Sequence, residues 1–310
     1  MIARTALLAA LAAAPALAND SEAGLSAGGL VFELRQNDQI EMVSEDLYIS
    51  VDRVRVDYQF VNHGDQDATI TVAFPMPDLR LDLGVPLAYY NNDTPGQAPL
   101  SFHVTVDGQP VATAHQERAT LNGRDVTDQV LAAGLPLNPF FAAHSDREPA
   151  TLTSAQQGLM QDGWPEWTYE SLFHWQQTFP AGKTIAVSHE YRPMAGGALI
   201  APDEIDASQP YWAQFCPEAD FIAGANRLMR RGDAGFVVAR MVGYILTTGG
   251  NWRGPITDFR LTVEKPAANT LVSFCASGVT KTSPTTFEVR RKDFTPDADL
   301  NILWIIPPGG

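Results

Sequence analysis

Cysteine and positive charge are both scarce in this sequence of 310 residues. Only 21 Lys and Arg residues stand against 36 Asp and Glu residues, which gives a formal net charge of −15. Because nucleic-acid affinity comes largely from basic side chains that neutralise phosphates, we expect no nucleic acid among the partners. Hydrophobic residues make up 45% of the chain and charged residues 18%, a composition that argues against a disordered protein.

Long apolar runs are also lacking, since a membrane-spanning helix needs about 20 apolar residues. The N-terminal run covers only residues 5–14, after Arg4, and Ala16-Leu17-Ala18 follows it. A charged start, a short apolar run and a small-residue cleavage site are typical of a secretory signal peptide. The sequence therefore predicts a signal peptide over 1–18, cleavage between Ala18 and Asn19, and a periplasmic or secreted product without a transmembrane segment.

The cysteines that are present number two, Cys216 and Cys275. Two cysteines in an oxidising compartment most often form one disulfide, and two buried free thiols are the alternative. Without a clustered set of histidines they make a poor zinc site. We expect no metal and no cofactor.

Alternating apolar and polar residues predict a mainly β protein. Val54, Val56, Tyr58 and Phe60 alternate with polar residues, the pattern of a strand with one buried face. Many short strands separated by turns are typical of β-sandwiches and barrels. We expect two β-sandwich-like domains, an N-terminal one over 19–195 and a C-terminal one over 196–310. The second should open with one helix that starts near Pro217 and should contain the disulfide.

Residues 120–165 break the strand pattern. Asp125 and the pair Thr153 and Gln156 have the spacing of helix N-terminal caps, so we predict a short helical insert in the first domain. Inserts on a rigid scaffold often carry function. We therefore expect the partner to contact this insert and the 78–99 loop. The aromatic residues of this predicted interaction surface are Phe140, Phe141, Trp164 and Trp167.

Several strings resemble the secreted bacterial domain-of-unknown-function family numbered 4424, over nearly all of the chain after the predicted signal peptide. They include Asn19-Asp20-Ser21, Ala73-Phe74-Pro75-Met76-Pro77-Asp78, Phe179-Pro180-Ala181-Gly182-Lys183 and Ser283-Pro284-Thr285-Thr286-Phe287. The cysteine positions of that family match Cys216 and Cys275, which supports the disulfide. The resemblance implies no activity.

A second resemblance covers residues 53–118 and 167–192. Its strings are Phe60-Val61-Asn62, Phe74-Pro75-Met76-Pro77 and Val106-Asp107-Gly108, which are similar to the vault/inter-alpha-trypsin β-sandwich domain. This resemblance implies an interaction module, by analogy of fold alone. It also implies that strands at 167–179 and 185–191 form a closing hairpin.

No set of residues in the sequence predicts a catalytic centre. Gly24 to Gly28 matches G-x-S-x-G, but no strand is predicted before it, so we interpret it as a flexible leader. In the expected hairpin His174 and His189 face opposite sides, and the neighbours Glu45 and Asp46 point to opposite faces of their strand. We therefore expect a non-enzymatic exported protein that binds another envelope protein or a glycan. An envelope-polymer hydrolase and a glycan or small-molecule binding protein are the alternatives.

Overall fold

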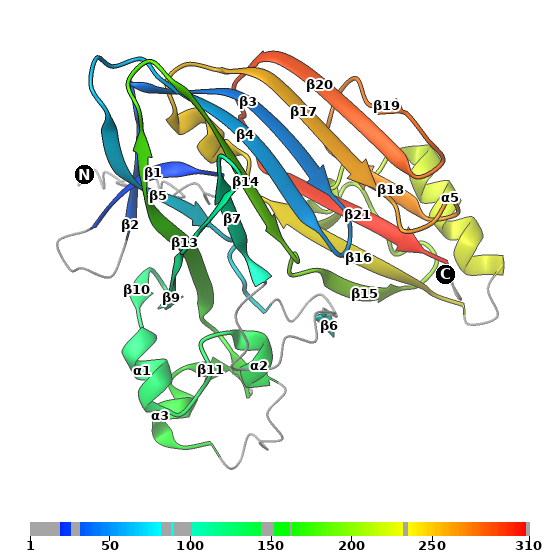
Figure 1. Cartoon of the computed structure of the whole chain (residues 1–310). Helices are drawn as coiled ribbons and strands as arrows, with labels where there is room; N and C mark the ends of the chain where they lie inside the picture. Colours follow the sequence, from blue (N-terminus) through cyan, green and yellow to red (C-terminus); the bar gives the residue numbers. More distant parts are fainter. Residues whose placement is uncertain are drawn as a thin grey trace, which may run out of the picture.

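Three β-sheets form most of the protein, which confirms the mainly β prediction (Figure 1). The computed structural model describes residues 19–25, 32–81, 88–89, 101–143, 152–161, 163–231 and 235–307. The eight-stranded sheet has the order β19 (Thr280–Lys281), β20 (Thr286–Phe294), β17 (Ile256–Glu264), β3 (Ile40–Ile49), β4 (Val54–Asn62), β14 (Thr184–Tyr191), β7 (His103–Val106), β8 (Gln109–Val111).

Two smaller sheets face it. The six-stranded sheet has the order β10 (Arg124–Asp125), β9 (Ala114–Leu121), β13 (Thr168–Phe179), β5 (Ala68–Pro75), β1 (Ser21–Leu25), β2 (Phe32–Arg35). The five-stranded sheet has the order β18 (Leu271–Phe274), β21 (Leu300–Ile306), β16 (Val237–Tyr244), β15 (Gly196–Ile200), β6 (Ala88–Tyr89). A hairpin of β11 (Met160–Gln161) and β12 (Trp164–Pro165) lies apart from all three.

The main hydrophobic core lies between the eight-stranded sheet and the two smaller sheets. The alternation read from the sequence places Val54, Val56, Tyr58 and Phe60 of β4 on the inner face, each at most 1% exposed. They share one apolar cluster with residues of β5 and β13 on one side and of β16 and β21 on the other. The structure is therefore a sandwich in which one large sheet is covered by two smaller ones.

Both predicted domain ranges contribute to the same sheet and the same core. Strand β17, from the second range, pairs in parallel with β3 from the first, with Leu261 opposite Leu47 and Val263 opposite Ile49. The core also joins Val56 to Ile302 and Trp304. The boundary expected between 195 and 196 consequently does not separate two sheets. Alternation marks which residues form strands, but it does not say which strands pair.

The closing hairpin expected at 167–191 is wrong for the same reason. Strand β13 pairs with β5 and β9 in the six-stranded sheet, whereas β14 pairs with β4 and β7 in the eight-stranded sheet. The turn at 180–183 thus carries the chain from one sheet to the other. Two strands that face each other across a core have the same apolar inward pattern as two that are hydrogen-bonded.

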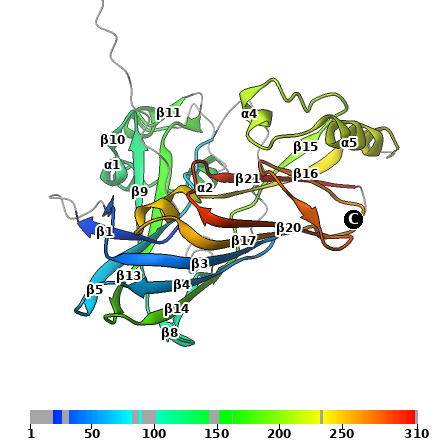
Figure 2. The ribbon, with the colours of Figure 1, turned by 90° about the horizontal axis from the view of Figure 1, so that it is seen from above.

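The predicted insert is present between β9 and β13, at the opposite end of the molecule from α5 (Figures 1 and 2). It contains α1 (Thr127–Ala132), α2 (Pro139–Ala143) and α3 (Ser154–Gln157). Asp125 accepts a hydrogen bond from the Thr127 amide, and Thr153 and Gln156 form the predicted capping box of α3. A small apolar cluster around Val130 and Trp167 holds the insert together.

Helices also cover the outer face of the five-stranded sheet (Figure 2). They are α4 (Pro210–Ala213) and α5 (Ala219–Arg231). Ala225 and Met229 of α5 are fully buried in a second core with residues of β15, β16 and β21. The helix predicted near Pro217 is therefore α5. The short 3-10 helix η3 (Thr247–Asn251) follows β16. No helix among the described residues is long and apolar enough to span a bilayer.

Candidate functional site

A group of polar side chains lies in the middle of the main core, where both smaller sheets meet the eight-stranded sheet. We call this group the buried polar cluster. Its members are Asn19, Asp20, Glu45, Tyr58, His189, Tyr244, Thr248 and Trp252. These residues come from the segment before β1, from β3, β4, β14 and β16, and from η3 and the residue after it. The cluster therefore ties all three sheets together.

A β-bulge turns Glu45 into the core. Before the bulge the buried residues of β3 are Ile40 and Met42, and the register with β4 shifts between Met42 and Ser44. The shift changes the phase of the alternation, so Glu45 becomes a buried position. Its neighbour Asp46 points to the outer face and accepts a hydrogen bond from Arg260 at 2.8 Å. The opposite orientation of these two carboxylates agrees with the sequence analysis.

Asn19 connects Glu45 of β3 to Tyr58 of β4 and to Thr248 of η3. Its Nδ2 donates to Glu45 Oε2 at 3.0 Å, and its Oδ1 accepts from the Tyr58 hydroxyl at 2.5 Å. Its carbonyl oxygen accepts from Thr248 Oγ1 at 2.8 Å. The Tyr58 hydroxyl is also 3.1 Å from that of Tyr244. Since Asn19 is fully buried, each of these bonds is made without competition from solvent.

Asp20 forms a buried pair with His189. Both Asp20 carboxylate oxygens lie within 3.0 Å of His189 Nε2, and the Asp20 carbonyl accepts from Trp252 Nε1 at 2.7 Å. Aromatic rings surround the imidazole at centroid distances between 5.2 and 5.4 Å. They belong to Tyr58, Phe74, Phe102 and Trp175. Such a pair is costly to separate, because either partner alone would be an uncompensated polar group in an apolar core.

The acid–base properties of the cluster follow from its burial. Removal from solvent raises the pKa of Glu45 from 4.5 to about 8; the charge of Asp20 adds to this, and hydrogen bonds from Asn19 and Tyr244 oppose it. Burial also raises the pKa of both tyrosine hydroxyls well above 10, so they remain neutral. The cluster thus holds two carboxyl groups and one imidazole, and Glu45 is the group that most needs a proton or a positive neighbour.

The buried polar cluster has the residue types of an acid–base site, but its groups are not accessible to a substrate. Asn19 and His189 are 0% exposed, and Asp20 and Glu45 are 1% exposed. A substrate could not reach these groups without opening the core. The geometry therefore fits a structural role, the fixing of residues 19 and 20 between the sheets. The sequence analysis did not identify this cluster, and the string Asn19-Asp20-Ser21 was its only signal.

The first residues after the predicted cleavage site are also more ordered than expected. Residues Ser21–Leu25 form β1, which pairs with β2 and β5, so the interpretation of this stretch as a flexible leader is wrong. The remaining part of the G-x-S-x-G string, 26–28, lies outside the described residues. Ser21 itself is buried and accepts a hydrogen bond from Asn251 Nδ2 at 3.0 Å.

The histidines His174 and His189 do not meet. His189 points into the core from β14, whereas His174 lies on the half-buried outer face of β13 between the buried residues Phe173 and Trp175. Partial burial lowers the pKa of His174. Among the described residues, no group of three or more His, Cys, Asp or Glu side chains could hold a metal ion.

The four aromatic residues of the predicted interaction surface have different environments. Trp167 is fully buried and donates from Nε1 to the Leu137 carbonyl at 2.6 Å, and Phe140 is 3% exposed. Phe141 is half-buried, whereas Trp164 is 44% exposed. Of the 78–99 loop, only 78–81 and 88–89 belong to the described residues. Trp164 is therefore the member of the four that a partner could contact directly.

A second group of ionisable residues lies on the outer face of the six-stranded sheet, close to the insert. Glu170 accepts from Arg118 Nε at 2.6 Å and from Thr120 Oγ1 at 2.7 Å. Partial removal from solvent and the negative charge of Glu170 raise the pKa of the nearby Asp78 to about 6. The positive charge of Arg118 opposes this effect. Because two donors already hold Glu170, it is poorly placed to serve as a free catalytic base.

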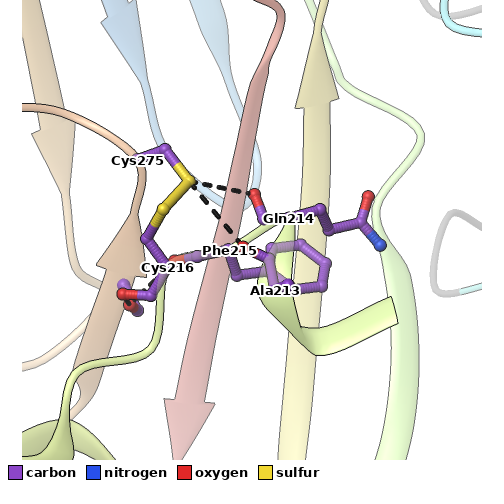
Figure 3. Close-up of a disulfide and its surroundings, with 6 residues drawn as sticks. Ala213, Gln214, Phe215, Cys216 and Cys275 are labelled. Atoms are coloured by element: carbon purple, nitrogen blue, oxygen red, sulfur yellow. Dashed lines mark hydrogen bonds between the residues drawn. A yellow bond between two sulfur atoms is a disulfide. The ribbon is translucent and has the colours of Figure 1, made fainter. Parts of the chain in front are cut away.

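Cys216 and Cys275 form the disulfide (Figure 3). It links the turn between α4 and α5 to the end of β18, which is an edge strand of the five-stranded sheet. Ser273 of β18 reinforces this link, because its Oγ lies 2.9 Å from the Phe215 carbonyl and 3.0 Å from that of Cys216. The bridge and these contacts hold the helical layer against the sheet.

Comparison with family models identifies the chain. The model described as Domain of unknown function (DUF4424) matches residues 18–303. The chain belongs to this family. The match confirms the resemblance found in the sequence strings.

Solved structures give matches of low identity, and no curated protein matches the chain. One match is a candidate nutrient-binding protein from Legionella pneumophila, with 18% identity, a TM-score of 0.48, and coverage of 87% of this chain and 68% of that one. Another is an M1 zinc metallopeptidase from Deinococcus radiodurans, with 12% identity and a TM-score of 0.27. It is matched over 89% of this chain and 44% of its own.

Proposed function

We propose that this DUF4424 protein is an exported, non-enzymatic module of the cell envelope that binds another envelope protein through its insert. The signal-peptide pattern of residues 1–18 and the disulfide both support an oxidising compartment outside the cytoplasm. The low content of basic residues argues against nucleic acid as the partner.

The observation that carries the non-enzymatic part is the burial of the acid–base groups. A catalytic acid or base must come within hydrogen-bond reach of the substrate. The buried polar cluster brings together two carboxyl groups, Asp20 and Glu45, and the imidazole of His189, and all three residues are at most 1% exposed. Asp78 and Glu170, on the outer face of the six-stranded sheet, also form a poor catalytic pair, because Arg118 and Thr120 already bind Glu170.

The insert is the best-supported contact surface. It has its own small core, it lies at one end of the sandwich, and it exposes two large apolar side chains, Leu131 at 54% and Trp164 at 44%. Exposed tryptophans are favoured at protein interfaces. A glycan-stacking strip formed by both insert tryptophans is disfavoured because Trp167 is fully buried. A protein partner therefore fits this surface better than a glycan.

Trp164→Ala should abolish capture of the partner and leave the fold intact. We expect at least a tenfold loss of partner recovered from a periplasmic extract, because an exposed interface tryptophan contributes about 2 kcal/mol or more when it is a hot spot. The free energy of unfolding should change by less than about 0.5 kcal/mol. The measurement is quantitative mass spectrometry of co-purified proteins, with wild type and variant in parallel.

Leu199→Ala is the matched control for this experiment. Leu199 is 54% exposed but lies on β15, in the five-stranded sheet rather than in the insert. Its replacement should leave capture unchanged. Equal capture by the wild type and Trp164→Ala would place the partner surface elsewhere, and recovery of a glycan instead of a protein would change the class of partner.

The export step has its own prediction. The intact mass of the protein isolated from the periplasm or medium should correspond to a chain that begins at Asn19. A product that retains Met1 and accumulates in the cytoplasm would contradict export. This measurement does not depend on the identity of the partner.

A further inference from the structure

The segment before β1 is held by an unusually complete set of hydrogen bonds. Asn19 uses its carbonyl oxygen and both polar side-chain atoms, with Thr248, Tyr58, Glu45 and the Asp20 amide as partners. Asp20 uses its amide, its carbonyl and both carboxylate oxygens. The remaining polar atom of these two residues is the backbone nitrogen of Asn19. Its chemical nature depends on whether the chain is cut at residue 18.

We propose that cleavage between Ala18 and Asn19 creates an α-ammonium group that serves as the internal counter-ion of the buried polar cluster. This proposal rests on the export part of the proposed function, since signal peptidase must make the cut. Processing then completes the core as well as releasing the protein. The ligand of the site is the new amino terminus of the chain itself.

Covalent geometry limits how far this amino group can lie from the Glu45 carboxylate. The backbone nitrogen of Asn19 lies within roughly 5 Å of its own side-chain amide, whatever the rotamer. That amide is 3.0 Å from Glu45 Oε2, and Asp20 is the adjacent residue. The new charge would therefore lie within roughly 8 Å of the Glu45 carboxylate and closer still to the backbone of Asp20. At such separations in a core of low dielectric constant, opposite charges attract strongly.

The charges of the buried polar cluster are not balanced, and one further positive charge would balance them. The titratable groups that face this point are Asp20 from the segment before β1, Glu45 from β3, Tyr58 from β4, His189 from β14 and Tyr244 from β16. The tyrosines are neutral, and His189 is engaged by Asp20. Burial raises the pKa of Glu45, and no cationic partner among the described residues opposes this effect. An α-ammonium would supply the missing positive charge.

A one-residue extension tests this proposal. A glycine inserted between Ala18 and Asn19 keeps the predicted cleavage site, and the processed chain then starts one residue early. Because the displaced charge no longer fits, we expect an about 100-fold lower ratio of folded to unfolded protein at pH 7, measured by urea unfolding. The intact mass of each protein must first show where its chain begins.

Glu45→Gln distinguishes a charge effect from a steric one. Glutamine keeps the shape and the hydrogen bonds of a protonated Glu45. In its presence, the folded-to-unfolded ratios of the chains with and without the added glycine should therefore differ by less than about tenfold. Asp46→Asn, a charge removal on the outer face of the same strand, should leave the 100-fold difference unchanged. No effect of the extra glycine, or an equal effect in the presence of Glu45→Gln, would overturn the proposal.

The pH dependence should also differ between the two starts. In the extended chain residue 19 again carries an amide nitrogen, the state in which burial raises the pKa of Glu45 from 4.5 to about 8. The folded state should then bind the proton more tightly than the unfolded state, so stability should fall as pH rises from about 4.5 to 8. In the chain that starts at Asn19 the ammonium stabilises ionised Glu45, so this fall should be much smaller. Its stability should instead decrease above about pH 8, when the amino group loses its proton.

A measurement on the wild-type protein completes the test without relying on variants. Reductive methylation at pH 7 should label the Asn19 α-amino group at least about 100-fold more slowly in the folded protein than in urea, because the group is accessible only after local opening. The lysine side chains serve as internal references. Fast labelling of a chain that starts at Asn19 would overturn the proposal, while partner capture and export would remain unaffected.

Discussion

Asp20→Ala should lower the free energy of unfolding by about 3–5 kcal/mol, because it breaks one half of a buried polar pair. Both carboxylate oxygens of Asp20 lie within 3.0 Å of His189 Nε2, and His189 is 0% exposed. Alanine would leave the imidazole without an acceptor inside a ring of aromatic side chains. Urea unfolding with the disulfide intact, followed by tryptophan fluorescence and circular dichroism, measures the change.

Glu190→Ala provides the control from the next residue along β14. Glu190 points to the outer face and pairs with Arg53 at 2.6 Å, and both side chains are 49% exposed. Exposed ion pairs contribute about 0–1 kcal/mol, so this variant should be nearly as stable as the wild type. Comparable losses for the two variants would mean that burial of the Asp20–His189 pair does not determine the effect.

The double replacement Cys216→Ser and Cys275→Ser should cost about 4 kcal/mol of stability, by the chain-entropy estimate for a loop of this size. The two residues are 59 positions apart, and their bridge ties the turn before α5 to the edge strand β18. Without it the helical layer depends on the second apolar core and on the contacts of Ser273. The midpoint of thermal unfolding should fall accordingly.

Reducing agent supplies the reference for this prediction. Dithiothreitol should destabilise the wild type to about the level of the double variant and should leave the double variant unchanged. Two freely alkylated thiols in natively purified protein would contradict the disulfide. A variant as stable as the wild type would show that the folded contacts, rather than the bridge, hold the α4–α5 turn.

The sequence was most informative where local rules decide the structure. Apolar alternation located β4, the spacing of Thr153 and Gln156 located the capping box of α3, and Pro217 marked the approach to α5. Each of these features depends on residues within one element or one turn. The disulfide was also predictable, since two cysteines have one intramolecular pairing.

Pairing between distant strands was beyond the same reasoning. The inward pattern of β13 and β14 is equally compatible with a hairpin and with two sheets that face each other, and the structure has the second arrangement. Glu45 was hidden for a related reason. A bulge between Met42 and Ser44 shifts the alternation of buried and exposed residues by one position, and no residue type in that stretch indicates the bulge. The buried polar cluster is assembled from six segments that are spread along the sequence, so no sequence motif predicted it.

The burial of residues 19 and 20 has a consequence for the order of events during folding. Thr248 and Trp252, which bind Asn19 and Asp20, follow them by 229 and 232 positions. Strand β3 likewise cannot complete its pairing until β17, which lies about 200 residues later in the chain, is present. Contacts across such long loops form late, so folding should take about milliseconds to seconds or longer. If the chain is exported N-terminus first, as proposed, the leading strands β1 and β3 would spend that interval with unpaired edges, exposed to association with other chains. The yield of folded protein should thus depend on a chaperone that protects the front of the chain until its end arrives.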